Sequence, residues 1–249
     1  MSNTMPLEGV KVVDLTQIMA GPFCTMLLGD MGADIIKVEQ PGRGDDTRAW
    51  GPPFVGEESA YFLGANRNKR GMTLNLKHPD GVAVFKRLVE KADVVVENFR
   101  PGVIGRLGID YESLKAVNPA IVLTSISGFG QDGPYAGRPG FDQIAQGMGG
   151  LMSITGQPGQ GPMRVGIPVA DLTAGLYAAL GTMVALLERE QSGQGQWVQT
   201  SLLAAQIAML DFQAARWLMK GEVAQQAGNN HPTSIPTGVF KTTDGHINI

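Results

Sequence analysis

The stretch that decides the fold is VKVVDLTQIMAGPFCTMLLGDMGADIIKVE, residues 10–39. Its first six residues, Val10 to Leu15, form an apolar run that predicts a β-strand, and residues 34–39 (DIIKVE) predict a second strand. Between them, a Gly-Pro turn at residues 21–22 is followed by an apolar run over residues 23–31 that predicts a helix. A strand, a helix and a second strand of these lengths predict a βαβ unit with parallel strands.

The same alternation continues along the chain. Further strands are predicted at residues 72–76, 93–97 and 121–127, and a turn that leads into a short strand at residues 193–200. Helices are predicted at 80–92, 101–107, 111–117, 171–190 and about 200–220. Residues 40–59 and 128–162 are rich in Gly and Pro and predict long loops. We therefore expect an α/β fold with a doubly wound, Rossmann-like parallel sheet.

The domain organisation follows from the same pattern. We expect a large domain over residues 1–221, followed by a linker and the start of a smaller domain over residues 222–249. The last residues, after the Asp-Gly turn at 244–245, resemble the middle of a strand. Because a domain rarely stops inside a strand, we expect the native protein to continue beyond residue 249.

Composition limits the classes of function. With 43% hydrophobic and 17% charged residues, the chain is typical of a globular protein with an ample core. The net charge of −3 gives no footprint for nucleic acid or for an anionic membrane, and the apolar runs do not predict a membrane span. The single cysteine, Cys24, excludes an internal disulfide, and with an N-terminus that lacks signal-peptide features it predicts a cytoplasmic protein. Three widely spaced histidines without partner cysteines predict no metal site.

Asp171 is the candidate nucleophile. Pro168 ends an extended run, and apolar residues at helical spacing follow Asp171, so the aspartate lies in the first turn of a helix. Free N–H groups and the helix dipole favour the ionised carboxylate at that position. A carboxylate held among small residues is a plausible nucleophile, and a simple helix cap is the alternative.

Two groups of cations suit a ligand with several phosphates. The first is NRNKR at residues 66–70, and the second is Arg100 with Arg106. Arginine matches phosphate oxygens, whereas a solvated loop is the alternative for the first group. The turn at residues 17–24 lacks the G-x-G-x-x-G pattern, so a NAD-dependent dehydrogenase is a weak alternative.

The chain resembles the family III CoA transferases (the CaiB/BaiF family), to which formyl-CoA transferase and α-methylacyl-CoA racemase belong. Six stretches carry the resemblance, in order: LEGVKVVDLT (7–16), GADIIKVE (32–39), NKRGMTLNLK (68–77), DVVVENFRPG (93–102), SGFGQDGPY (127–135) and ADLTAG (170–175).

The resemblance implies a chemistry and a set of site residues. It implies that Asp171 attacks an acyl-CoA thioester, and that CoA reaches a free carboxylic acid through aspartyl anhydride and aspartyl-CoA thioester intermediates. It also implies an interlocked homodimer, with CoA as substrate and no permanently bound cofactor. The predicted contacts to CoA and its acyl group are Gln17, Met19, Ala20, Gln40, Lys69, Arg70, Leu74, Asn75, Lys77, Asn98, Phe99, Arg100, Arg106 and Phe141.

Three residues depart from the patterns of known members. Met19 stands where formyl-CoA transferase has glutamine, so its oxalate and formate chemistry is not carried over. Gln40 stands where that enzyme has arginine, which removes one contact with CoA. Phe141 stands where the racemase has the histidine of its Gly-His-Asp motif. Because phenylalanine cannot carry a proton, a transferase is favoured over a racemase. A racemase or epimerase, and a non-catalytic acyl-CoA-binding homologue, are the alternatives.

Overall fold

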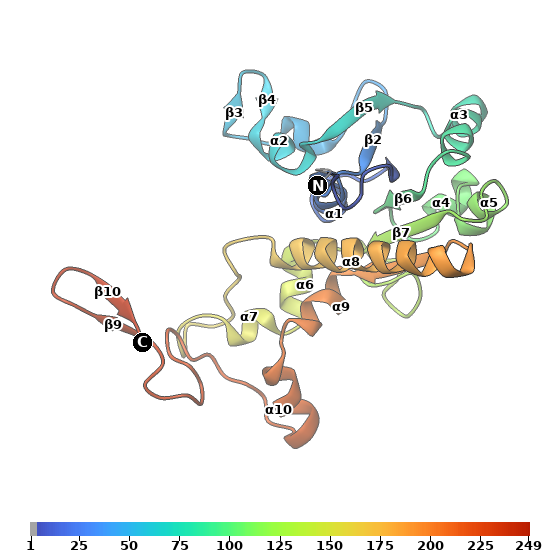
Figure 1. Cartoon of the computed structure of the whole chain (residues 1–249). Helices are drawn as coiled ribbons and strands as arrows, with labels where there is room; N and C mark the ends of the chain where they lie inside the picture. The colour runs from blue at the N-terminus through green and yellow to red at the C-terminus, as the bar shows by residue number, and fades with distance from the viewer. Residues whose placement is uncertain (1–3) are drawn as a thin grey trace.

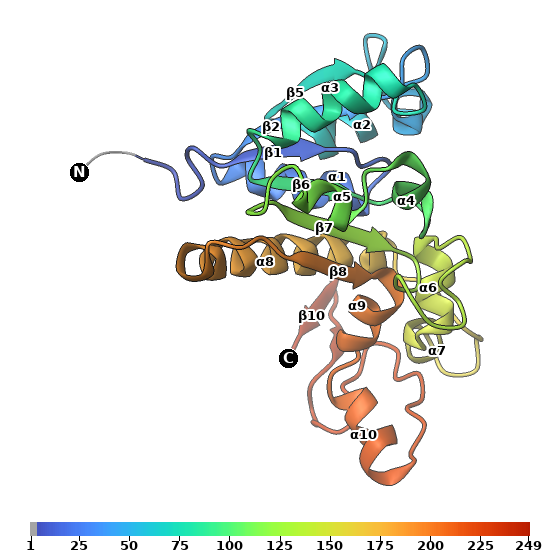
Figure 2. The same ribbon diagram turned by 90° about the vertical axis from the view of Figure 1, so that its right-hand side faces the viewer.

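A six-stranded, wholly parallel sheet forms the centre of the structure, a computed structural model that describes residues 4–249 (Figures 1 and 2). Its strands are β1 (Lys11–Asp14), β2 (Asp34–Glu39), β5 (Lys69–Thr73), β6 (Val94–Glu97), β7 (Val122–Ser127) and β8 (Trp197–Ser201). They lie in the order β5-β2-β1-β6-β7-β8, and every neighbouring pair is parallel. The doubly wound, Rossmann-like sheet predicted from the sequence is confirmed.

The strand order reverses between β1 and β6. The chain builds outward from β1 to β5 and then returns to place β6 on the other side of β1. The loops that leave the carboxyl ends of β1 and β6 therefore diverge, and such a switch point is where open α/β sheets bind ligands.

Helices cover both faces of the sheet. On one face α1 (Ala20–Asp30) and α8 (Val169–Ser192) bury Cys24, Leu28 and a row of alanines against Val12 and Val94. On the other face lie α3 (Pro79–Val89), α4 (Val103–Leu107) and α5 (Tyr111–Lys115), which Figure 1 shows together on the side away from α1. Successive strand residues such as Val12 and Val13 point to opposite faces, so both clusters are built from the same strands.

The region predicted as one helix over residues 200–220 is the main error in element assignment. Its first residues belong to β8, which pairs with β7, and Ser201 then caps α9 (Leu202–Ala208). Asp211, with φ of 47°, separates α9 from α10 (Phe212–Lys220). Pairing with β7 draws Thr200 and Ser201 into β8, so the helix begins at Leu202. The local apolar pattern could not show this pairing, because β7 lies far away in the sequence.

The two predicted loops are more ordered than their composition suggests. Residues 40–59 contain the short helix η1 (Asp46–Ala49) and the hairpin β3 (Phe54–Val55) and β4 (Glu58–Ser59), and α2 (Ala60–Asn66) follows. Residues 128–162 contain α6 (Asp142–Met148) and α7 (Leu151–Ile154). Asp45 in the first segment accepts the N–H of Ile18 in the turn after β1, and Gly128 and residues 138–142 of the second segment line the cavity at the carboxyl edge of the sheet.

By length and composition alone, α8 is apolar enough to cross a membrane. Half of its most apolar window is buried in the structure, as expected of a core helix that covers a sheet. The expectation that the protein has no membrane partner stays a prediction.

The last elements are the antiparallel strands β9 (Val239–Lys241) and β10 (His246–Asn248), which stand apart from the sheet in Figure 1. The proposed domain boundary at residue 221 also stays a prediction.

Candidate active site

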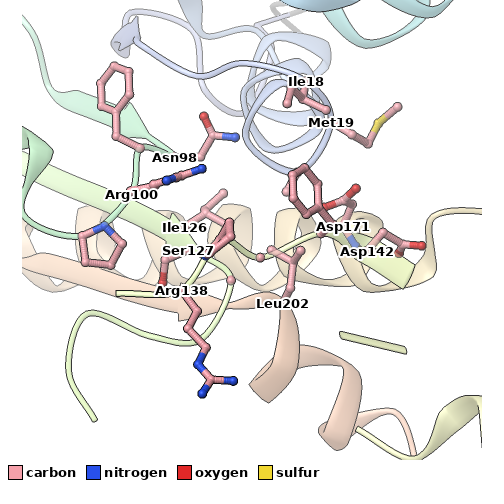
Figure 3. A pocket seen from close by; sticks show the side chains of 17 residues that line it. Ile18, Met19, Asn98, Arg100, Ile126, Ser127, Arg138, Asp142, Asp171 and Leu202 are labelled. Carbon is pink, nitrogen blue, oxygen red and sulfur yellow. Dashed lines mark hydrogen bonds between the residues drawn. The ribbon is translucent and has the colours of Figure 1, made fainter. Parts of the chain in front are cut away.

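A cavity of about 260 Å³ opens at the switch point between β1 and β6 (Figure 3). It is lined by residues 18–20 after β1, 98–101 after β6, 126–128 at the end of β7, 138–142 before and at the start of α6, and by Asp171 and Leu202. In Figure 3, Asp142 and Asp171 lie together on one side and Asn98 and Arg100 on the other.

Asp171 occupies the first turn of α8, as predicted. One turn further along, Gly175 brings the backbone of α8 against the first turn of α1. A Cβ on Gly175 would lie 2.7 Å from the carbonyl oxygen of Ala20, which is closer than real side chains allow. The absence of a side chain at position 175 therefore sets the distance between the candidate nucleophile and the start of α1.

Asp142, and not Asp171, caps α8. Its Oδ1 accepts the N–H groups of Ala170 at 2.8 Å and of Asp171 at 3.4 Å, while its Oδ2 accepts a bond from Gln146 at 2.7 Å. The residue before the helix, Pro168, offers no side-chain cap. The alternative role of Asp171 as a simple cap is therefore wrong, and its carboxylate is left for chemistry.

The environment of Asp171 disfavours its charge. Burial and the nearby carboxylate of Asp142 raise the pKa of Asp171 to about 7. The expectation that the helix terminus holds Asp171 ionised is overturned, because burial and a like charge outweigh the dipole. A carboxylate with a pKa near neutrality is a stronger nucleophile than an ordinary one, and perturbed groups of this kind are typical of active sites.

Tyr61 on α2 lies within electrostatic range of the same carboxylates. Burial and the charges of Asp171 and Asp142 raise its pKa to about 12, so the phenol keeps its proton and can donate a hydrogen bond. Neither Tyr61 nor Asp142 was among the residues predicted from the sequence. The sequence did contain a signal for Asp142, because this residue follows Phe141 at the position of the aspartate in the racemase's Gly-His-Asp motif. No sequence motif around Tyr61 indicates a functional role.

The turn after β1 is fixed from several sides. Asn98 donates to the carbonyl oxygen of Gln17 at 2.7 Å and accepts its N–H at 2.8 Å. Helix α1 then begins at Ala20 with neither a side-chain cap nor an acidic residue in its first turn. Its free N–H groups and positive dipole end therefore lie at the cavity that Met19 and Ala20 line.

The loop after β6 depends on a buried glutamate. Glu97 Oε2 accepts the N–H of Phe99 at 2.8 Å, and its carboxyl is also hydrogen-bonded by Ser125 on β7. Burial, partly offset by these bonds, raises the pKa of Glu97 to about 7. Ser125 in turn accepts a bond from Trp197 Nε1 at 2.9 Å. These hydrogen bonds orient the loop that carries Arg100. Arg100 has no ion-pair partner among residues 4–249.

The structure brings together about half of the predicted site residues. The ones that line the cavity are Met19, Ala20, Asn98, Phe99, Arg100, Phe141 and Asp171. Others lie outside its lining, in the segments that follow β1, β2, β5 and β6: Gln17, Gln40, Leu74, Asn75, Lys77 and Arg106. Their predicted contacts with CoA stay predictions.

Lys69 and Arg70 do not fit the role predicted for them. Lys69 has a side chain only 2% exposed, lies 3.1 Å from Asp14 and donates to the carbonyl oxygen of Pro22 at 2.9 Å. Arg70 lies at the amino end of β5, where it forms an ion pair with Asp34 at 2.7 Å. Lys69 is neutralised inside the fold, whereas the side chain of Arg70 is 67% exposed and its ion pair lies at the surface. The burial of Lys69, and the position of Arg70 at the amino end of its strand and away from the cavity, do not favour the predicted role for either cation at the phosphates of CoA.

Across the part of the chain that the structure describes, no cluster of three His, Cys, Asp or Glu side chains could hold a metal ion. The cavity lining offers two carboxylates, backbone N–H groups, two guanidinium groups, an amide and a hydroxyl, the guanidinium groups being those of Arg100 and Arg138.

The comparisons with known proteins identify the family. Residues 7–249 match CoA-transferase family III, and the chain belongs to that family.

Among similar proteins is succinyl-CoA:glutarate CoA-transferase of Homo sapiens, 47% identical over 247 residues, which cover 99% of this chain and 56% of that protein. Succinate–glutarate CoA-transferase of Agrobacterium fabrum is 47% identical over 248 residues, covering 97% and 62%. The crystal structure of a CAIB/BAIF family protein from Brucella suis is 44% identical with a TM-score of 0.93, covering 98% and 65%. The chain thus spans less than two thirds of the length of each.

Proposed function

We propose that this chain carries the nucleophile of a CoA transferase, which moves CoA from an acyl-CoA thioester to a free carboxylic acid. The observation that carries the proposal is the position of Asp171. Its carboxylate faces a cavity at the switch point, and a second carboxylate has taken over the capping of its helix. Family membership and relatives that act as CoA-transferases support the same reaction.

The reaction proceeds by four acyl transfers. The ionised carboxylate of Asp171 attacks the thioester carbonyl, the C–S bond breaks, and an acyl-aspartyl anhydride and CoA thiolate result. The thiolate then attacks the aspartyl carbonyl and releases the donor acid, leaving an aspartyl-CoA thioester. The acceptor carboxylate attacks that thioester and expels the thiolate, giving a second anhydride. Attack of the thiolate on its acceptor carbonyl yields the new acyl-CoA and restores Asp171.

The residues around Asp171 supply what these steps need. Each addition places negative charge on a carbonyl oxygen, and the free N–H groups at the start of α1 are the donors suited to hold it. Arg100 is available for the phosphates of CoA. Phe141 offers no base, so proton abstraction from the acyl chain is disfavoured relative to transfer.

The names of the relatives suggest the substrates. Because two of them are named for succinyl-CoA or succinate with glutarate, we propose succinyl-CoA as donor and a dicarboxylic acid as acceptor. We also propose that the protein acts in the cytoplasm as a homodimer.

Intact-protein mass spectrometry tests the proposed reaction. The protein is mixed with a panel of acyl-CoA thioesters, with Asp171→Ala as the matched variant. We expect a covalent CoA or acyl adduct on the parent that is absent from Asp171→Ala. CoA binding without any adduct would favour a pure binding protein. Entry of solvent deuterium into the acyl chain without an acceptor acid would favour a racemase.

A further inference from the structure

Ile18 has a backbone conformation that its side chain disfavours. Its φ is 72°, in the left-handed region, where a β-branched residue is an outlier. The other non-glycine residues with positive φ among the described positions are Asn68 and Asp211, types that tolerate this region. Ile18 and Met19 both line the cavity, so the strained residue lies in the active-site turn itself.

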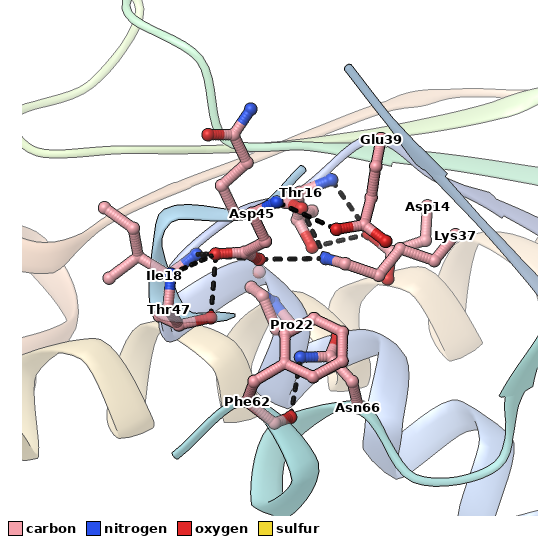
Figure 4. Close-up of polar contacts among 12 residues, drawn as sticks. Asp14, Thr16, Ile18, Pro22, Lys37, Glu39, Asp45, Thr47, Phe62 and Asn66 are labelled. Atoms are coloured by element: carbon pink, nitrogen blue, oxygen red, sulfur yellow. Dashed lines mark hydrogen bonds and ion pairs between the residues drawn. The ribbon is translucent and has the colours of Figure 1, made fainter. Parts of the chain in front are cut away.

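A buried ion pair holds this residue in place. Both oxygens of Asp45 accept the N–H of Ile18, at 3.2 and 3.3 Å (Figure 4). Lys37 lies 3.0 Å from Asp45 and also donates to the carbonyl oxygen of Thr16 at 2.8 Å. The two partners therefore contact the turn on both sides of Gln17.

The pair is fully enclosed. The side chains of Lys37 and Asp45 are 3% and 0% exposed. Thr47 donates two further hydrogen bonds to the carboxylate of Asp45, from its N–H at 3.0 Å and from its hydroxyl at 2.8 Å. Burial opposes the charge of Asp45, but Lys37 and these hydrogen bonds outweigh it and hold the pKa of Asp45 below its ordinary value. Buried ion pairs are poor sources of stability compared with apolar packing, so their value lies in the geometry that they impose.

We propose that the Lys37–Asp45 pair is a positioning device: it keeps Ile18 in the left-handed conformation and so fixes the backbone N–H groups at the start of α1 beside Asp171. The inference rests on the proposed transferase function, in which those N–H groups hold the charge that develops on the carbonyl oxygen. Lys37 and Asp45 act through the turn and do not touch the substrate.

The test asks whether removing the backbone strain at Ile18 restores the activity that is lost when the ion pair is broken. Asp45→Asn removes the charge that Lys37 needs, and Ile18→Gly removes the cost of positive φ, because glycine adopts it freely. Asp46→Asn, an identical change at the exposed neighbouring residue, is the matched control. We expect Asp45→Asn to lower kcat by ~10- to 100-fold with a smaller change in KM, the size of effect that misplacement of a catalytic group produces. Adding Ile18→Gly should recover most of that loss.

Amide hydrogen exchange at residues 17–20 gives a readout that does not need turnover. Asp45→Asn should speed exchange there, and Asp46→Asn should not. This measurement separates the proposal from the transferase function, since it holds even if no thioester reacts. If Asp45→Asn fails to fold, the pair Lys37→Met with Asp45→Asn leaves no lone buried charge and serves instead.

Two results would overturn the proposal. One is unchanged exchange and unchanged kcat in Asp45→Asn. The other is a loss of kcat in a folded Asp45→Asn protein that Ile18→Gly does not recover, which would leave the ion pair with a purely structural role.

Discussion

Asp142 caps the helix that carries Asp171, and the two carboxylates are thereby held together at the start of α8. The capping bond of 2.8 Å to the N–H of Ala170 accounts for the position of Asp142 without any contribution from the side chain of Asp171. The consequence is electrostatic. One carboxylate stabilises the helix terminus, and its charge, together with burial, raises the pKa of the other to about 7.

The rate of CoA transfer should therefore depend on pH near neutrality. Only ionised Asp171 can attack a thioester, and its pKa in the free protein is about 7, so kcat/KM should fall below that pH by about tenfold per unit. Above pH 8 it should reach a plateau. Steady-state rates between pH 5 and 9, with a thioester that is stable over this range, measure the midpoint.

Asp142→Asn identifies the origin of this midpoint. An amide oxygen still accepts the N–H of Ala170, so the helix cap is kept while the neighbouring charge is lost. The pKa of Asp171 should fall, and the midpoint of the pH–rate profile should move to lower pH. A midpoint that stays unchanged would mean that burial alone, or another group, sets the pKa.

The same pKa shift predicts how folding stability depends on pH. Asp171 binds its proton more tightly in the folded protein, with a pKa of about 7, than in the unfolded chain, where it is 3.8. Its contribution to stability is fully present below about pH 4 and is lost as the pH rises through about 7. Asp171→Asn cannot ionise, so at pH 8 its free energy of unfolding should exceed that of the parent by about 1–4 kcal/mol.

Denaturant titrations at pH 4 and pH 8 measure this difference. Asp46→Asn, the same exchange of a carboxylate for an amide in the ion pair with Arg43, is the control. Parallel stability curves for the parent and Asp171→Asn would contradict the raised pKa.

The four inner strands of the sheet were predictable because they are rich in apolar residues and lie between turns. The edge strand β5 begins three residues before the predicted range of 72–76, because its first residues, Lys69 to Gly71, carry no apolar pattern. The run of residues 34–39 has the observed bounds of β2, and the order of strands and helices follows the doubly wound pattern. What the sequence could not show was pairing between distant residues. The contact of Lys69 with Asp14, and of Asp142 with the N–H of Ala170, joins segments that only the folded sheet brings together.

Gly175→Ala should impair the site through the backbone. The new methyl group would meet the carbonyl oxygen of Ala20 at 2.7 Å, so α8 or α1 must shift. We expect a loss of about 1–3 kcal/mol of stability. Because the shift separates Asp171 from the N–H groups of α1, kcat should fall more than the affinity for CoA.

Gly64→Ala is the matched control for this change. Gly64 is also a helical glycine, on α2, but a Cβ there would meet nothing within 4 Å. Alanine is the better helix former by about 1 kcal/mol, so this variant should be as stable as the parent or more so. Equal effects of the two substitutions would show that the contact with Ala20 does not govern the site. Thermal denaturation and steady-state kinetics of both variants make the comparison.

Glu97→Ala should loosen the loop that carries Arg100. It leaves the N–H of Phe99 and the hydroxyl of Ser125 without their acceptor in a buried place, which costs about 1–3 kcal/mol. Glu97→Gln keeps an acceptor for the N–H of Phe99 and should be milder.

Because Phe99 and Arg100 line the cavity, we expect the dissociation constant for CoA to rise in the order parent, Gln variant, Ala variant. Isothermal titration with CoA measures this order, and the fluorescence of Trp197, whose indole bonds to Ser125, reports the change in the hydrogen-bond chain. An Ala variant that is destabilised but binds CoA as tightly as the parent would show that the loop keeps its shape without Glu97.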